Sequence, residues 1–342
     1  AEFETKNARL NVGLFELSPF SKFDLKGEKV HEELQILCTA NIPNEPGKIK
    51  YTQMLNADGG IETDLTVICI EKNYFRIVSS AANREHDKFH ILKHISKDVK
   101  LTDVTEDYCC LGLFGPKSRD MISSISSDNF SNENFKFATA KLVKINDIEL
   151  WAQRISYVGE LGFELYVKKE NALKLFDILM DKGKTYKISL CGMHAMDIMR
   201  MESGFLHWGH DISPEENQFE AGLNFAVSFK KNINFIGRAA LEKKRDKKDH
   251  KKFKMLILNH SKEGAPLLLH DEPIYLKDKI VGRTTSGCYS FNYNKNLAFG
   301  YINSGLTSDQ IDKEAFEIEV EKKKYPASVI TRPLNDKKLS SL

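Results

Sequence analysis

The sequence predicts an α+β protein that ends in a small antiparallel β-barrel. Up to residue 241, β-prone runs are interspersed with amphipathic helical segments. The run of charges from Glu242 to Lys254 is then typical of a solvated linker between domains. Beyond it, short β-prone runs follow at even spacing, which is typical of a small barrel or sandwich. We therefore expect one domain over residues 1–241 and a barrel domain over residues 250–335.

The composition is that of an ordinary globular protein. Of the 342 residues, 41% are hydrophobic and 29% are charged, and 50 basic side chains nearly balance 48 acidic ones. This balance favours neither a nucleic-acid nor a membrane partner, and no apolar run approaches the ~18 residues of a spanning helix. The chain begins at Ala1 with neither Met nor a signal-peptide pattern, as expected for part of a longer or processed chain. The six cysteines include no C-x-x-C pair, so we expect reduced thiols in the cytosol or the mitochondrial matrix.

Periodicity and turn residues predict the elements of both domains. In the first domain they are turns and a strand over 11–24, a helix over 30–40, a hairpin within 47–70, a strand over 74–80, a helix over 85–95, a strand over 108–114, a helix from 116 to 125, a hairpin over 140–156, a strand over 163–167, and helices over 171–182 and 191–204. In the barrel they are strands at 253–258, 273–279, 281–286, 297–302, 316–320 and 327–330. The expected buried stripes are Phe89, Leu92 and Ile95 in one helix and Leu173, Phe176 and Leu179 in another.

Residues 154–167 are the most informative stretch of the chain. Two glycines, Gly159 and Gly162, predict a tight turn between two strands. The strand after the turn alternates in polarity, which places Glu164 on the face opposite its apolar neighbours. Because acids are seldom buried without a partner, this carboxylate either faces solvent or reads a ligand.

The hairpin within residues 47–70 is the second informative stretch. Its turn cluster Asn-Ala-Asp-Gly-Gly ends at Gly60, between two β-prone runs. Folding the chain about this cluster places Tyr51 opposite Asp64, within one residue of register. We therefore expect a phenol and a carboxylate to be neighbours, either as a polar pair on a solvated face or as part of a site.

Histidines recur at spacings that metal sites also use. His86, His90 and His94 lie four residues apart in one helix, and His207 and His210 lie three apart in a loop. Neither group has further ligands at a spacing that completes a coordination shell. We therefore expect no metal, and we interpret the three helical histidines as an exposed polar stripe.

An arginine and a tryptophan near the end of the first domain have two interpretations each. Arg200 shares a helical stripe with two methionines, so it points inward. It either pairs internally with Asp197 or Glu202, or it reads a substrate carboxylate. Trp208 lies in a Gly-bounded loop and is either core filler or a platform for a planar ligand.

Several of these strings together resemble a known family. The pattern Tyr157-x-Gly-Glu-x-Gly-Phe-Glu164 is similar to the signature of the folate-binding aminomethyltransferases, the family of the glycine cleavage T-protein. The strings Gly-Gly-Ile-Glu-Thr-Asp64 and His207-Trp-Gly-His-Asp resemble its dimethylglycine and sarcosine dehydrogenase branch. The likeness covers nearly the whole chain. It implies mixed α/β subdomains around a central folate cavity, followed by the barrel.

The resemblance also implies tetrahydrofolate as the cofactor and assigns roles to individual residues. Asp64 matches the catalytic acid beside N5 and N10 of tetrahydrofolate, and Glu164 matches the acid that reads the pterin ring. The other implied folate contacts are Tyr51, Tyr157, Arg200 and Trp208.

Two departures from the T-protein pattern favour the dehydrogenase-linked branch. Met196 stands where T-proteins have arginine, and Ser80 stands where they have asparagine. That branch carries a flavin on a dinucleotide fold ahead of the folate unit, but the sequence has no G-x-G-x-x-G motif. We therefore expect FAD only if a separate flavoprotein domain or subunit supplies it.

Three functions follow from these observations. The first is tetrahydrofolate-dependent transfer of a methylene or methyl unit from an N-methylated amine of the dimethylglycine or sarcosine type. The second is a stand-alone aminomethyltransferase or a methyl-transferring demethylase. The third is a non-catalytic module of the same fold that binds folate or a partner.

Overall fold

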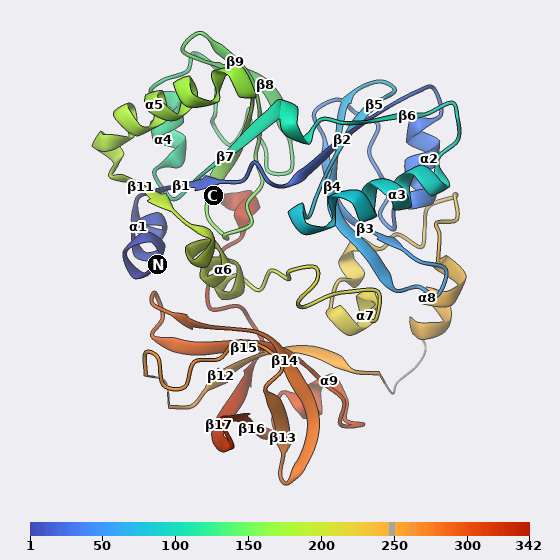
Figure 1. Cartoon of the computed structure of the whole chain (residues 1–342), viewed down its shortest axis with the longest axis vertical. Coiled ribbons are helices and arrows are strands. Elements are labelled where there is room, and N and C mark those ends of the chain that lie inside the picture. Colours follow the sequence, from blue (N-terminus) through green and yellow to red (C-terminus); the bar gives the residue numbers. More distant parts are fainter. Residues whose placement is uncertain (246–249, 261) are drawn as a thin grey trace.

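A computed structural model describes residues 1–245, 250–260 and 262–342. In these residues two β-sheets form two neighbouring lobes, and a closed barrel forms a third lobe beneath them (Figure 1). The chain enters the first sheet with one strand, builds the second sheet with the next five, and then returns to complete the first. The two lobes are therefore interleaved in sequence and form a single unit.

The first sheet has the strand order β11-β1-β7-β10-β9-β8. Its strands are β1 (Val12–Glu16), β7 (Tyr108–Phe114), β8 (Ala140–Ile145), β9 (Ile148–Gln153), β10 (Gly162–Lys168) and β11 (Ile188–Cys191). Helices α4 (Ser118–Ser123) and α5 (Ala172–Gly183) cover its outer face, where the apolar half of each alternating strand is buried. Phe163 and Leu165 lie on this outer face, as the alternation predicts.

The second sheet has the strand order β3-β4-β5-β2-β6. Its strands are β2 (Ser21–Lys26), β3 (Ile49–Leu55), β4 (Ile61–Glu71), β5 (Tyr74–Ser79) and β6 (Lys100–Asp103). Helices α2 (Val30–Leu37) and α3 (Arg84–His94) cover its outer face. Its inner face packs against the inner face of the first sheet, and Phe114, Tyr166, Ile68 and Val78 share one buried cluster there.

Two helices and the barrel close the space between the sheets. Helices α1 (Glu2–Leu10) and α6 (Met193–Glu202) contribute Ala8 and Met199 to the inter-sheet cluster. The opposite side of α6 packs on the barrel, where Met201 contacts the cluster around Phe299. Helix α6 therefore lies between the lobe of the first sheet and the barrel, as Figure 1 shows.

The barrel closes on itself with the strand order β12-β15-β14-β13-β16-β17. Its elements are β12 (Lys252–Leu258), β13 (Pro273–Leu276), β14 (Lys279–Ser290), β15 (Lys295–Ile302), α9 (Ser308–Ile311), β16 (Ala315–Val320) and β17 (Lys323–Ile330). Helices α7 (Gln218–Ala221) and α8 (Arg238–Arg245) lie in the segment that leads to it. This is the α+β architecture with a C-terminal antiparallel barrel that the sequence predicts.

Several local predictions are wrong. Residues 11–24 contain two strands rather than one, and α4 ends at Ser123 rather than at residue 125. Helix α8 extends to Arg245, so the charge run begins inside a helix. The part of the predicted linker at residues 246–249 lies outside the described residues.

The predicted buried stripe of α3 is also wrong. Phe89 is 70% exposed, whereas Ile91 and Asp87 are buried. Asp87 accepts a hydrogen bond from Thr63 Oγ1 at 3.1 Å, so a polar contact turns this face of the helix toward the sheet. His90 is buried as well, so the three histidines do not form a uniformly exposed stripe.

In α5 the expected stripe is displaced by part of a turn. Leu173 is 72% exposed, Leu179 is buried as predicted, and Leu175 takes the second buried position against the sheet. The displacement leaves the contact with β10 intact, since Phe176 still packs against the same cluster.

Candidate functional site

The hairpin of β3 and β4 presents a carboxylate and a phenol to the space between the sheets. Asp64 pairs with Gln53, and Tyr51 pairs with Thr66, so the predicted register is wrong by two residues. The turn is closed by Asn56 and Gly60, and a bulge beside Met54 shifts the pairing further. A shift of two preserves the face, because side chains alternate with a period of two.

Asp64 is half-buried and is held by its neighbours. Gln53 Nε2 donates a hydrogen bond to Asp64 Oδ1 at 2.8 Å. Burial raises the pKa of Asp64 to about 6, although the contacts with Gln53 and Tyr51 lower it. Burial, and then the charge of Asp64, raise the pKa of the Tyr51 phenol well above its ordinary value. Tyr51 thus stays a hydrogen-bond donor, while Asp64 changes protonation state near neutral pH.

Glu164 faces the same space from the first sheet. It lies on β10 between Gly112 of β7 and Gln153 of β9, and it is 9% exposed. Tyr166 Oη donates a hydrogen bond to its Oε2 atom at 2.7 Å. Burial raises the pKa of Glu164 to about 7, while Tyr166 and Lys22 lower it. The solvent-facing interpretation of this acid is therefore wrong.

The turn before β10 is built from contacts that are distant in sequence. Residues 154–161 are irregular, so the strand expected at 154–157 is absent from the described chain. Gly159 has a φ of +72°, and a Cβ atom there would lie 1.9 Å from Ser203 Oγ. Asn335 Nδ2 donates a hydrogen bond to the Gly159 carbonyl at 2.8 Å. Lys337 Nζ lies 2.6 Å from Glu160 Oε1, so the tail after the barrel fixes this turn.

Tyr157 and Phe205 form an aromatic pair between this turn and α6. Their rings stack with centroids 6.3 Å apart and an interplanar angle of 17°. Tyr157 Oη donates a hydrogen bond to the Leu206 carbonyl at 3.0 Å, and burial raises the pKa of the Tyr157 phenol. Sequence reasoning missed Phe205, although its place in the Gly-bounded loop after α6 was a usable signal.

Arg200 forms ion pairs and hydrogen bonds with other side chains of the protein. Its Nη1 atom lies 2.5 Å from Asp211 Oδ2, its Nε atom donates to Asp197 at 2.8 Å, and its Nη2 atom donates to Ser286 at 2.8 Å. Arg200 is 2% exposed. These contacts agree with the internal-pair interpretation, except that Asp211 is the buried partner. Glu202 instead pairs with Arg9 of α1 at 2.7 Å. The geometry gives no support to Arg200 as a reader of substrate carboxylates.

Trp208 is anchored in a core beside the hairpin. Its indole Nε1 atom donates to the Ile61 carbonyl at 3.1 Å, and its ring packs against the buried cluster that contains Ile212. Phe225 stacks on the ring of Tyr51 with ring centroids 6.1 Å apart, and its side chain is 71% exposed. No motif or periodicity in the sequence singles out Phe225.

The histidines take part in ordinary polar contacts. His86 lies 2.9 Å from Glu62 Oε1 and 3.0 Å from Asp87 Oδ1. Among the described residues, no group of three or more His, Cys, Asp or Glu side chains could hold a metal ion. In the same residues, no helix combines the length and the apolarity that crossing a membrane requires.

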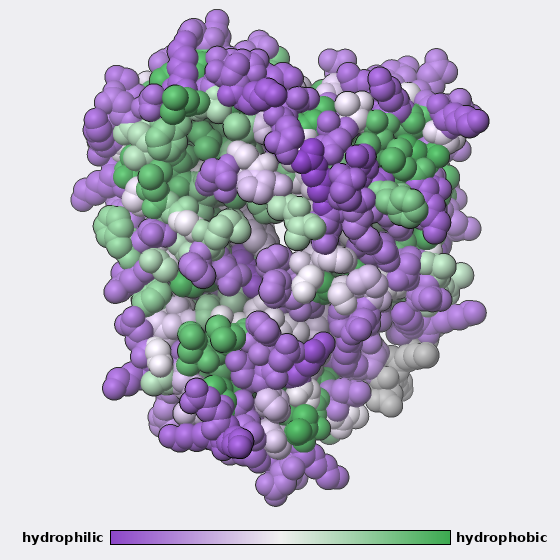
Figure 2. All heavy atoms as spheres, in the orientation of Figure 1, coloured by the Kyte–Doolittle hydropathy of each residue, from purple (hydrophilic) through white to green (hydrophobic). Residues whose placement is uncertain are grey.

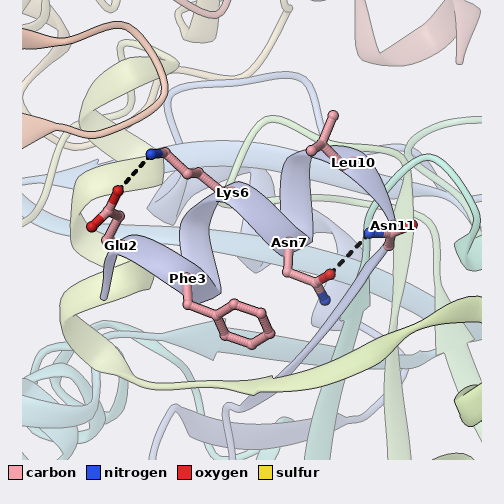
Figure 3. A pocket seen from close by; sticks show the side chains of 6 residues that line it. All are labelled: Glu2, Phe3, Lys6, Asn7, Leu10 and Asn11. Carbon is pink, nitrogen blue, oxygen red and sulfur yellow. Dashed lines mark hydrogen bonds and ion pairs between the residues drawn. The ribbon is translucent and has the colours of Figure 1, made fainter.

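The inward-facing acids lie where the lobes meet. Figure 2 shows that the surface is hollowed near its centre, between the two upper lobes and the barrel. A separate shallow hollow lies on the outer face of α1, where Phe3 and Leu10 are exposed and Lys6 pairs with Glu2 (Figure 3). That hollow is formed by a single helix and does not reach Asp64 or Glu164, so we place the candidate site between the sheets.

Two family models match this chain. The GCVT N-terminal domain matches residues 1–231, and the glycine cleavage T-protein C-terminal barrel domain matches residues 251–336. The chain belongs to the glycine cleavage T-protein family. Members of the T-protein family are folate-dependent enzymes, and their GCVT domains bind tetrahydrofolate. The family that the signature ending at Glu164 predicts is confirmed.

Curated relatives are similar along nearly the whole chain. A formaldehyde-forming 4-methylaminobutanoate oxidase of Paenarthrobacter nicotinovorans is 35% identical over 340 residues, which cover 98% of this chain and 40% of the relative. Mitochondrial dimethylglycine dehydrogenase of Rattus norvegicus is 33% identical over 337 residues, which cover 97% of this chain and 38% of the relative. The chain therefore spans about two fifths of the length of these relatives.

A solved structure shares the fold. The crystal structure of the glycine cleavage system aminomethyltransferase T from Bartonella henselae matches with a TM-score of 0.86 at 21% identity, over 98% of this chain and 89% of that chain. The aminomethyltransferase-like fold that the resemblance implies is thereby confirmed.

Proposed function

We propose that this chain transfers a one-carbon unit from an N-methylated amine, of the dimethylglycine or sarcosine type, onto tetrahydrofolate. The observation that carries the proposal is the placement of two acids, the half-buried Asp64 and the buried Glu164, on the facing sides of two sheets. Both have a raised pKa, as is common for acids at functional sites. The similarity to a dimethylglycine dehydrogenase and a methylaminobutanoate oxidase supports the choice of donor.

The side chains between the sheets suit a reduced pterin. A pterin presents an N–H and an amino group side by side, and the Glu164 carboxylate can accept from both. The buried surroundings of Glu164 strengthen such contacts, because the local dielectric is low. Tyr51 and Tyr157 would form apolar walls with polar tips beside the ligand. Arg200 and Trp208, which the resemblance also implies as contacts, would support the loop from inside rather than touch the ligand.

Asp64 would stabilise the positive charge of the donor carbon and take up a proton during the transfer. Bound tetrahydrofolate would supply the nitrogen nucleophiles that take up the one-carbon unit. An ionised Asp64 can stabilise the cationic donor carbon as it arrives, and it can accept the proton that the attacking nitrogen releases. Gln53 holds the carboxylate in one orientation through the 2.8 Å hydrogen bond. The Tyr51 phenol would donate a hydrogen bond to the same carboxylate throughout the transfer.

The amine must be oxidised elsewhere before its carbon can be transferred. Two-electron oxidation of an N-methyl amine needs an acceptor such as FAD, which we assign to a separate flavoprotein domain or subunit. We propose a functional division into a folate-binding domain at residues 1–241 and a barrel domain at 250–335, working in the cytosol or the mitochondrial matrix. The alternative activities, a stand-alone aminomethyltransferase and a methyl-transferring demethylase, differ in the donor and would use the same folate site.

The proposal can be tested in two steps with the full chain. Titration calorimetry under anaerobic conditions should show stoichiometric binding of tetrahydrofolate; no binding would leave only the non-catalytic interpretation. A flavin-dependent dimethylglycine oxidase added in trans should then yield methylene-tetrahydrofolate, quantified by mass spectrometry. In the Asp64→Ala variant, methylene-tetrahydrofolate should form only at the uncatalysed rate, while the affinity for tetrahydrofolate changes little. Wild-type turnover in that variant would refute the role of Asp64.

A further inference from the structure

Each of the two site acids has a buried glutamine directly across the strand pair. Gln153 of β9 pairs with Glu164, and Gln53 of β3 pairs with Asp64. Gln153 is 2% exposed and Gln53 is fully buried. Within residues 1–245, 250–260 and 262–342, neither glutamine Oε1 atom accepts a hydrogen bond, although both atoms are shielded from solvent.

These two orphaned oxygens are exceptions to a strong rule. Buried polar atoms are nearly always paired, and one without a partner needs an explanation such as a missing ligand. Both glutamines share a face with groups of the inter-sheet cluster: Gln153 lies two residues from Trp151 on β9, and Gln53 lies four residues from Ile49 on β3. The orphaned oxygens therefore belong to the same space as the two acids.

The orientation of one glutamine is fixed by its neighbour. An ionised carboxylate accepts hydrogen bonds and cannot donate them, so Gln53 must turn its Nε2 atom toward Asp64. Its Oε1 atom is then left as an acceptor. The Gln53 carbonyl, the Glu164 carboxylate and the Gln153 carbonyl then offer hydrogen-bond acceptors to the inter-sheet space from both sheets.

The oxidation state of a pterin decides how well it fits such a set of acceptors. The tetrahydro form carries N–H groups at both N5 and N8, in addition to N3 and the 2-amino group. The dihydro form keeps the N–H at N8 but has a lone pair at N5, and the fully oxidised form has lone pairs at both positions. A lone pair facing a carbonyl oxygen leaves both atoms unpaired, which a buried site penalises.

We propose that Gln53 and Gln153 make this site selective for the fully reduced pterin, by presenting carbonyl acceptors to the ring N–H groups. This inference rests on the proposed folate function. It assigns the two glutamines as specificity residues that touch the ligand, whereas Tyr166 only positions Glu164. Sites built to hydrogen-bond a ligand N–H reject analogues that lack it far more strongly than apolar pockets do.

The test compares affinities for three oxidation states in matched variants. Dissociation constants for tetrahydrofolate, dihydrofolate and folic acid are measured by anaerobic calorimetry on wild type, Gln53→Met and Gln153→Met. Methionine keeps the length of the side chain and removes the amide. Gln35→Met is the control, because Gln35 is a buried glutamine of α2, on the outer face of the second sheet, that bonds to the Ile42 backbone.

The wild type should prefer tetrahydrofolate over folic acid by at least about 100-fold, and each site variant should reduce this ratio by about 10-fold. The control should lose stability without changing the ratio. If the wild type binds tetrahydrofolate but neither site variant changes the ratio, this inference is overturned and the proposed function stands. If one variant alone changes it, the assignment of the other glutamine is overturned. If the wild type binds none of the three folates, the proposed function fails.

Discussion

Replacing Arg200 with methionine should lower the free energy of unfolding by about 3 kcal/mol. The guanidinium is 2% exposed, and the Asp211 side chain that it contacts at 2.5 Å has no exposed surface. Removing one partner of a buried ion pair costs about 3–5 kcal/mol, because the remaining charge stays buried. The lower end applies here, since Asp211 keeps hydrogen bonds from the His207 amide, Thr285 and Ser286.

Urea unfolding of wild type, Arg200→Met, Asp211→Asn and the double variant measures this effect. If the two residues act as a pair, the double variant should be more stable than the sum of the single losses predicts, by at least about 1 kcal/mol. Lys29→Met serves as the matched control, because the pair of Lys29 with Asp98 is exposed, and it should leave the urea midpoint unchanged.

A ligand comparison decides between the two interpretations of Arg200. If the arginine is structural, Arg200→Met should weaken tetrahydrofolate and a tetrahydropterin without the glutamate tail by the same factor. A loss confined to the glutamate-bearing ligand, or a stability change below about 1 kcal/mol, would refute the structural role and restore the anion-reading one.

Three further predictions concern the two acids and the exposed ring of Phe225. Asp64 and Glu164 have pKa values raised to about 6 and about 7, so each stabilises the fold below its unfolded pKa, and this contribution is lost as pH rises through the folded value. Asp64→Asn and Glu164→Gln should therefore gain stability relative to wild type between about pH 4 and pH 7, by up to about 3 kcal/mol each in chemical denaturation; equal pH profiles would contradict the raised pKa values. Tetrahydrofolate affinity should fall below about pH 7, because a protonated Glu164 accepts fewer hydrogen bonds, and Glu164→Gln should flatten the pH profile measured by calorimetry. Phe225→Ala should weaken tetrahydrofolate binding by about 3- to 10-fold with an unchanged melting temperature, since the ring is 71% exposed and stacks on Tyr51; a large loss of stability would show that the ring serves the fold instead.

The sequence identified the face of each key acid but not its surroundings. Alternation around Glu164 places it opposite Phe163, and this is observed. Its burial could not be read from the strand, because the second sheet that covers it comes from residues more than 60 positions earlier in the chain. Period-two patterns report a face, and only the assembled fold decides whether solvent reaches it.

Errors of register and of partner had identifiable physical causes. The turn closed by Asn56 and Gly60 shifts the pairing by one residue and the bulge beside Met54 by another, so Tyr51 lies opposite Thr66 rather than Asp64. The sequence left Arg200 either paired within its own helix or reading a substrate carboxylate; Asp197 of the same helix is a partner, but the buried partner Asp211 comes from the next loop. Gln53 and Gln153 were not selected at all, because a single glutamine carries no periodic or motif signal.

The tail beyond the barrel gives this site a practical sensitivity at a remote position. Asn335 and Lys337 hold the turn that leads into the strand of Glu164, and the Leu342 carbonyl accepts from Arg119 and Arg154. A protease cut between the barrel and Asn335 would therefore free the turn that leads to Glu164 without cutting either sheet.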